Sequence, residues 1–390
     1  MPDFRPFRAV RYNLDRVDLG DVVAPPYDVI DPEERARLEA RSPYNVVSVD
    51  LTADYDSARC TFDEWHAAGV LVTDDEPGFY LYRMGWRDAA GALRQTTGVL
   101  GALALDPDRT GSVLPHERTM AKPLGDRLRL LRSCRTDLSP IWAMSMAEGL
   151  SDLCQPEGPP LARCTDDDGV HHRLWRVTAP AALDALRSMV ASAPAVIADG
   201  HHRYETSLAY RAEQREANGG EPGPYDFVLT YLVELSDGQL GVRPIHRLLS
   251  GLPESVSLHE VLADAFHADA VPVTHEQLVA EPGLAVVEPG RAWMLRPKAT
   301  AEAGDSPLTD AERLETALPA LAEHAVAFHH DPRQVVALVD KGDADAAVLL
   351  RAPTVGQIAA AARAGRRLPQ KTTFFIPKPR TGLVFRRLAD

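Results

Sequence analysis

The spacing of apolar and polar positions predicts both strands and helices in the first part of the chain. The apolar run Phe227–Leu235 has no polar face, which is typical of a strand in the centre of a sheet. Two other apolar segments, Gly78–Trp86 and Arg94–Leu105, flank a polar turn and predict a hairpin. A helix is predicted over Pro32–Arg41, because Asp31 is placed to cap it and proline is tolerated at the first helical position.

The order of the predicted elements favours an α+β fold with a mixed sheet. Strands and helices do not alternate strictly, so a doubly wound parallel sheet is disfavoured. After Ser250 the pattern changes to helical segments separated by short strands. We therefore expect two regions. Residues 1–250 would carry the functional site, and residues 251–390 would form an α+β region whose last strands, at about 370–390, return to that site.

Composition and charge favour small molecules as partners. The formal net charge is −14 and no run of Lys and Arg interrupts it, so we expect no nucleic-acid partner. No apolar run reaches the length of about 18 residues that a membrane span needs, so we expect no membrane partner. The four cysteines form no Cys-x-x-Cys pair, which fits a reducing compartment, and we expect a cytoplasmic protein. The oligomeric state stays open, with a homodimer as one alternative.

The stretch VIADGHHRYETSLAYR passes from a buried strand to an amphipathic helix and concentrates polar groups at the junction. We expect Asp199 to cap the helix and Gly200 to allow a tight turn. The main-chain amides of His201, His202 and Arg203 would then lie at the helix N-terminus, where they attract anions. The guanidinium of Arg203 would add a two-pronged donor for phosphate.

Two other interpretations of this stretch remain open from the residues alone. A metal site would need His201 and His202 to converge, but adjacent helical residues point about 100° apart. Metal-binding helices usually space their histidines at i and i+4, which this stretch does not. The second alternative is a capped helix whose two histidines are hydrogen-bonded within the protein.

Two short polar segments offer candidate catalytic or metal-binding groups. His116 and Glu117 follow a predicted strand and could supply a general base for a hydroxyl and an acidic metal ligand, or form an exposed polar turn. Asp28 lies in a loop restricted by prolines and could bind Mg²⁺ or cap the next helix.

Basic residues outside the central motif are candidate phosphate contacts. Arg247 could complete a phosphate clamp or pair with a carboxylate. Lys378 and Arg380 lie on a proline-restricted turn, which lowers the entropy cost of holding a cation against a ligand. By contrast, we expect the pair His171–His172 and the acidic run Asp166–Asp168 at the surface.

The sequence D-G-H-H-R resembles the motif of the ParB and sulfiredoxin-like superfamily, which includes free serine kinases. Four separated blocks, APPYDVI, LPHERTM…DRLRLL, IADGHHRYETSLAYR and FIPKPRTGLVF, resemble an uncharacterised bacterial family, domain of unknown function 1015, over nearly the whole chain. The first resemblance implies a ParB/sulfiredoxin-like core whose helix N-terminus faces nucleotide phosphates. A sulfiredoxin-like redox role is disfavoured, because it would need a cysteine where this chain has His201.

Together, the residues and the resemblances predict a nucleotide-dependent phosphotransferase that uses ATP or ADP and Mg²⁺. Its substrate would be a small hydroxylated metabolite, with free serine as one candidate. The segment Asp199–Arg203 would hold the nucleotide phosphates, His116, Glu117 and His202 are the candidate catalytic residues, and Asp28 or Glu117 would bind the metal. A phosphatase or nucleotide hydrolase with the same residues is an alternative. A nucleotide-binding switch is another, which the net charge disfavours.

Overall fold

The computed structural model of the chain describes most of its residues. The described residues are 1–52, 54–88, 90–115, 117, 125–253, 256–270, 278, 283–298, 308–321 and 324–388. They form two compact units. The first unit comprises Met1–Pro115, Ala121–Gln239 and Pro377–Asp390, and the second comprises His116–Met120 and Leu240–Ile376.

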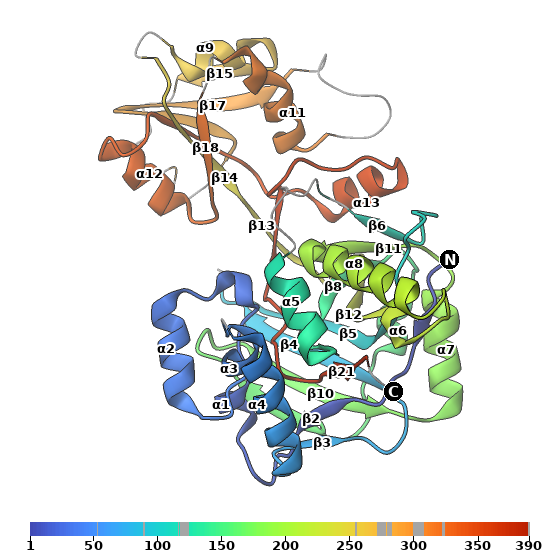
Figure 1. Ribbon diagram of the computed structural model, residues 1–390. Helices are drawn as coiled ribbons and strands as arrows, with labels where there is room; N and C mark the ends of the chain where they lie inside the picture. Colours follow the sequence, from blue (N-terminus) through green and yellow to red (C-terminus); the bar gives the residue numbers. More distant parts are fainter. Residues whose placement is uncertain are drawn as a thin grey trace. The chain divides into compact units, whose positions relative to one another are not determined.

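The first unit is built on a large mixed sheet (Figure 1). Its strand order is β6-β11-β8-β12-β5-β4-β10-β9, with β1 paired to β5. The strands are β1 (Phe4–Arg5), β4 (Phe79–Arg87), β5 (Leu93–Ala104), β6 (Val113–Pro115), β8 (Ile141–Ser145), β9 (Ala162–Thr165), β10 (His171–Val177), β11 (Ala195–Asp199) and β12 (Phe227–Glu234). β11 is parallel to β6 and β12 is parallel to β8, whereas the other pairs are antiparallel. The predicted mixed sheet and the internal position of β12 are confirmed.

Helices and two strand pairs complete the first unit. The helices are α1 (Leu19–Val22), α2 (Pro32–Arg41), α3 (Val47–Asp50), α4 (Tyr55–Ala67), α5 (Gly125–Cys134), α6 (Leu150–Leu153), α7 (Pro180–Val190) and α8 (His201–Ala217), with short 3₁₀ turns η1 (Tyr27–Val29) and η2 (Pro224–Asp226). The strand pairs are β2 (Val10–Tyr12) with β3 (Leu71–Thr73), and β7 (Thr136–Asp137) with β21 (Arg386–Arg387).

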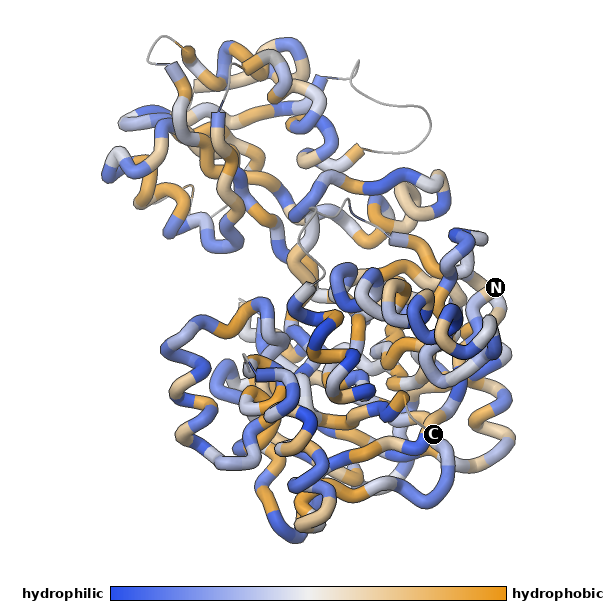
Figure 2. Tube along the Cα trace, in the orientation of Figure 1, coloured by the Kyte–Doolittle hydropathy of each residue, from blue (hydrophilic) through white to orange (hydrophobic). Residues whose placement is uncertain are grey.

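The helix predicted from residue 32 is confirmed as α2. The carboxylate of Asp31 accepts a hydrogen bond from the amide of Glu34 at 2.8 Å, as a helix cap should. α2 is mostly hydrophilic in Figure 2, and Leu38 is its buried residue. Within the described residues, none of the helices is both long and apolar enough to cross a bilayer.

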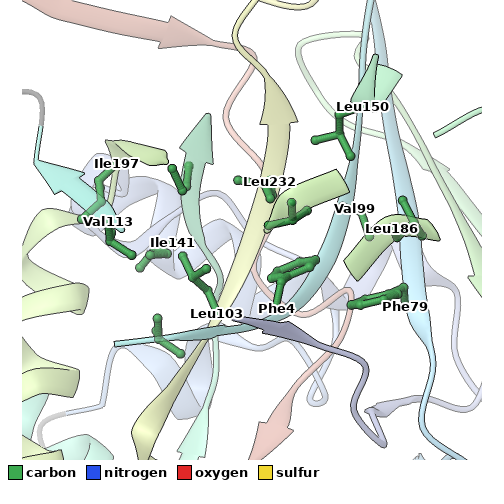
Figure 3. Close-up of a cluster of buried hydrophobic side chains, with 14 of the residues drawn as sticks. Phe4, Phe79, Val99, Leu103, Val113, Ile141, Leu150, Leu186, Ile197 and Leu232 are labelled. Atoms are coloured by element: carbon green, nitrogen blue, oxygen red, sulfur yellow. The ribbon is translucent and has the colours of Figure 1, made fainter. Parts of the chain in front are cut away.

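A cluster of apolar side chains from the sheet and from α7 forms the main core of the first unit (Figure 3). Phe4 stacks on Phe79 with ring centroids 5.1 Å apart, and Leu186 and Val190 of α7 join the cluster. Burial of each such side chain contributes about 1.5–3 kcal/mol. Gly101 is needed beneath this pair, because a Cβ there would lie 2.4 Å from the ring of Phe4.

The C-terminal segment lies in the interior of the first unit. Thr381 exchanges two main-chain hydrogen bonds with Ala24, and Phe385 does the same with Val10. Phe385 is fully buried, and β21 pairs with β7 directly after it. Because these hydrogen bonds fix the C-terminal segment, residues 378–380 lie beside strands and helices that are far away in the sequence.

The second unit contains an antiparallel sheet with the order β15-β17-β16-β19-β14-β18. Its strands are β14 (His246–Ser250), β15 (Phe266–Ala270), β16 (Ala285–Glu288), β17 (Arg291–Pro297), β18 (Ala325–His329) and β19 (Ala346–Leu349), and a separate pair joins β13 (Gly241–Pro244) to β20 (Thr373–Ile376). The helices are α9 (Leu258–Val261), α11 (Asp310–Ala317), α12 (Pro332–Asp340) and α13 (Val355–Arg363). Side chains alternate across a strand, so Val286 and Val287 belong to different apolar clusters. Helices and sheets occur in both units, so the predicted α+β class is confirmed.

Candidate functional site

The predicted tight turn between β11 and α8 is present, and Gly200 forms it. Gly200 occupies the cap position of α8 with φ +87° and ψ 26°, in the left-handed region that favours glycine. The amide of Tyr204 donates to the carbonyl of Gly200 at 3.0 Å and so begins the helical ladder. The amides of residues 201–203 precede that bond, which leaves them at the positive end of the helix dipole.

The prediction that Asp199 caps α8 was wrong. Its carboxylate instead pairs with the Nζ of Lys378 and with the Nη2 of Arg203, the latter at 3.0 Å. Burial acts to raise the pKa of Asp199, but Lys378 and then Arg203 outweigh it and hold this pKa below its ordinary value. The structure therefore brings together three predicted site residues, from β11, α8 and the C-terminal segment.

Arg203 also lines a small cavity beside α8. The cavity has a volume of about 50 Å³, which is enough for a few water molecules. Its polar lining consists of Tyr27, Asp50, Arg127, Thr136, Asp137, Ser139, Arg203, Thr206 and Ser207. The Nη1 of Arg203 donates to the Oγ of Ser139 at 3.2 Å and to the carbonyl of Pro140. The cavity thus joins the PPYDV, DRLRLL and DGHHR segments of the sequence.

A buried ion pair forms one wall of this cavity. The Nη1 of Arg127 donates to the Oδ1 of Asp50 at 3.0 Å, and the same guanidinium lies over the ring of Tyr27, 4.4 Å from its centroid. Burial raises the pKa of Asp50, and the opposing effects of Arg127 and Arg203 compensate for it only in part. Asp50 is therefore a carboxylate with a raised proton affinity on the wall of a cavity that Arg127 and Arg203 also line, which suits a proton acceptor. No motif in the sequence distinguishes Asp50 from the other acidic residues.

Asp28, His201 and His202 lie near this cavity or near the start of α8. Asp28 is exposed on η1, next to Tyr27, and its charge acts to raise the pKa of both Tyr27 and Asp50. His201 and His202 are half-buried in the first turn of α8. Among the described residues, no group of three or more His, Cys, Asp or Glu side chains could hold a metal ion. A metal ion bound by protein groups alone is therefore not supported there.

The sequence matches the model of a protein family described as "Protein of unknown function (DUF1015)" over residues 4–342. The chain belongs to this family. The resemblance to this family is thereby confirmed, and three of the four sequence blocks lie within the matched residues, whereas FIPKPRTGLVF at 375–385 lies after them. No curated protein shows significant similarity to the chain.

This DUF1015 protein is remotely similar to several solved structures. A conserved hypothetical protein from Pyrococcus furiosus is 13% identical, with 72% of this chain and 95% of that chain covered and a TM-score of 0.36. A mutant free serine kinase in complex with ADP is 12% identical, with 70% and 87% covered and a TM-score of 0.39. C-terminally truncated SbnI from Staphylococcus aureus is 12% identical, with 72% and 85% covered and a TM-score of 0.39.

Arg380 of the DUF1015 protein belongs to a buried polar network instead of the cavity lining. Its guanidinium pairs with Asp166, whose Oδ2 also contacts the Nε2 of His172 at 2.8 Å. The Nδ1 of His172 lies 2.7 Å from the hydroxyl of Tyr82. The expected surface position is confirmed for His171, Asp167 and Asp168. It was wrong for His172, which is buried, and for Asp166, whose side chain is only 9% exposed. Burial lowers the pKa of His172, which favours its neutral form, although Asp166 opposes this effect.

The remaining predicted residues belong to the second unit, where they hold one turn. Glu117 accepts hydrogen bonds from the amides of Lys371 and Thr373, at 3.1 and 2.9 Å. Arg247 donates to the carbonyls of Lys371 and Gln370, at 3.0 and 3.3 Å, and burial lowers its pKa to about 10. Both side chains therefore stabilise the backbone of the turn at residues 370–373. His116 lies outside the described residues.

Proposed function

We propose that this DUF1015 protein is a nucleotide-dependent phosphotransferase whose small hydroxylated acceptor presents its hydroxyl group to the cavity beside α8. The observation that supports this most is that Arg127 and Arg203 line one cavity and that Lys378 joins Arg203 through their shared partner Asp199. Catalysis of phosphoryl transfer depends mainly on positioning the two substrates and on neutralising the charge of the transferred group. Arginine and lysine side chains beside a small cavity can do both.

The donor phosphates would bind at the N-terminus of α8. The turn at Gly200 aims main-chain amides out of the helix, and Lys378 adds a cation beside it. A cavity of about 50 Å³ does not hold a nucleotide, so the base and ribose of ATP or ADP would lie outside it. Mg²⁺ usually binds through one or two carboxylates together with the substrate phosphates, and Asp28 is the exposed carboxylate that fits this use.

The acceptor hydroxyl would lie between Asp50 and the two arginines of the cavity. When bound, the nucleotide supplies a terminal phosphoryl group, which passes to the acceptor oxygen while the hydroxyl proton passes to Asp50. Arg127 and Arg203 would stabilise the charge on the transferred group. Asp50 takes the place of Glu117 as the candidate base, because Glu117 holds a turn of the second unit.

The proposal is tested by incubating the purified chain with Mg²⁺ and either ATP or ADP, together with a panel of hydroxylated amino acids that includes serine. We expect a phosphorylated acceptor, detected by mass spectrometry, and its loss in Arg203→Ala. The matched control is Arg187→Ala, because Arg187 is an exposed arginine on α7 outside the cavity. Phosphate release that does not depend on an acceptor would indicate a hydrolase. If no nucleotide is bound or turned over, the proposal is wrong.

A further inference from the structure

A separate, arginine-rich cleft lies in the first unit, beside the C-terminal half of α8. It has a volume of about 580 Å³ and is lined by four arginines, Arg5, Arg211, Arg215 and Arg386. Its lining shares no residue with that of the cavity that contains Arg203. Arg211 and Arg215 are four residues apart on α8, so they project from the same face of the helix.

The cleft has an excess of positive charge that the chain as a whole does not have. The whole sequence contains 42 basic and 56 acidic residues, whereas the described residues that line the cleft include four arginines and one carboxylate, Asp226. Asp226 pairs with both Arg211, at 2.8 Å, and Arg215, at 2.8 Å. Arg5 and Arg386 pair with Asp3 and Asp137, which do not line the cleft. Asp226, Arg211 and Arg215 together carry one net positive charge. A guanidinium has five donors in a fixed plane, so such a pair can also hold an anion with several oxygens.

Contacts of Arg386 and Arg5 stabilise the shape of the cleft, and two phenylalanine rings form an apolar part of its lining. Arg386 is buried and donates to Asp137 and to the carbonyl of Phe227 at 2.9 and 3.0 Å. The guanidinium of Arg5 lies 4.4 Å from the centroid of the Phe227 ring, and Phe7 also lines the cleft. A ligand that fits would therefore combine a compact anion with a small organic part.

We propose that this cleft binds the phosphate monoester of a small metabolite. Arg211 and Arg215 would hold the phosphate oxygens, and the organic part would lie against Phe227 and Phe7. This site goes beyond the proposed phosphotransfer, because it requires neither a nucleotide nor turnover. Since α8 also carries Arg203 in its first turn, a ligand here would stabilise the helix that presents the other site.

The inference is tested by calorimetric titration with glycerol 3-phosphate, inorganic phosphate and succinate at fixed ionic strength. We expect glycerol 3-phosphate to bind more tightly than the other two, and Arg211→Gln to weaken its binding at least tenfold. Arg94→Gln is the control, because Arg94 is an exposed, carboxylate-paired arginine outside the cleft, and it should bind like the wild type. If Arg211→Gln does not fold, Arg5→Gln at the exposed rim replaces it.

Three results would overturn the inference. They are unchanged binding in the cleft variant, an equal loss in Arg94→Gln, and binding of succinate or inorganic phosphate that is as tight as that of glycerol 3-phosphate. Arg203→Ala separates the two sites, because it should weaken nucleotide binding and leave the titration with glycerol 3-phosphate unchanged. A chain that binds no nucleotide but shows the expected glycerol 3-phosphate titration would contradict the proposed function alone.

Discussion

Two groups of charged residues, one in each unit, contain the same kinds of side chain and use them differently. In the second unit, Arg247 and Glu117 bind main-chain carbonyls and amides of the turn at residues 370–373. In the first unit, Arg127 pairs with the side chain of Asp50 on the wall of a cavity, and Arg203 pairs with Asp199 beside it. The difference lies in the partners, which are mainly backbone groups in one case and mainly side chains in the other.

Residue type alone therefore does not separate structural charges from functional ones. A buried charge that satisfies main-chain groups leaves those groups without a partner if it moves, which costs about 1–3 kcal/mol for each. A pair of side chains around a cavity can exchange partners when an anion enters. We therefore expect changes at the first group to alter chemistry more than stability, and changes at the second group to alter stability.

The largest expected effect is on turnover in Asp50→Asn. The amide can still accept a hydrogen bond from Arg127 but cannot take a proton, so we expect kcat to fall by about 10²–10⁴-fold. Nucleotide affinity should stay within a few-fold of the wild type. Asp126→Asn is the matched control, because Asp126 contacts the same arginine at 2.8 Å from an exposed position. Equal kcat values for the two variants would contradict the role of Asp50 as a base.

The second prediction concerns Arg247→Met in the second unit. The variant keeps an unbranched apolar stem but removes the donors to the carbonyls of Lys371 and Gln370, so we expect a loss of about 2–4 kcal/mol in the free energy of unfolding. Urea unfolding would measure it. The control Arg243→Met changes an exposed arginine in the neighbouring strand β13 and should cost less than about 0.5 kcal/mol. A similarly small change for Arg247→Met would remove the distinction between the two groups.

The third prediction concerns the turn that begins α8. In Gly200→Ala, the left-handed backbone costs about 1–2 kcal/mol, and the new Cβ would lie 3.1 Å from the guanidinium of Arg203. Gly111→Ala is a matched control, since Gly111 has φ +89° but open space around its Cβ position. Both variants should lose similar stability in thermal unfolding, whereas only Gly200→Ala should weaken nucleotide binding. If nucleotide binding weakens equally in both, the position of Arg203 does not control it.

The sequence was sufficient to predict features that depend on neighbouring residues. β12 and α2 were predicted from an apolar run and from a cap with proline at the first helical position, and both signals act within a few residues. The turn at Gly200 was predicted for the same reason, because its backbone conformation is a local property.

Features that depend on distant partners could not be predicted. Asp199 looks like a helix cap, but Lys378, 179 residues away, takes its carboxylate. Asp50 is one acid among many until packing places Arg127, 77 residues later, beside it. His172 is next to an acidic run, yet it alternates inward on β10, where pairing with β4 brings the hydroxyl of Tyr82 to it.

The smallest predicted effect contrasts two carboxylates of the first unit in acid. The pKa of Asp199 is lower in the folded chain than its ordinary value of about 3.9, so its ion pair stabilises the fold above that value. This stabilisation is lost as the pH falls toward the folded pKa. The pKa of Asp50 is raised, so the folded chain binds a proton there more readily than the unfolded chain does. Its contribution to stability therefore increases as the pH falls through the raised pKa.

These opposite signs can be measured with the two asparagine variants. We expect the difference in unfolding free energy between wild type and Asp199→Asn to shrink as the pH is lowered from 6 toward 3. For Asp50→Asn, the difference should shift in favour of the wild type over the same interval, because protonation removes the cost of a buried charge. Urea titrations at each pH would measure both. Parallel pH dependence in the two variants would mean that burial and ion pairing do not act on these carboxylates in opposite directions, and that Asp50 lacks the raised proton affinity a base would use.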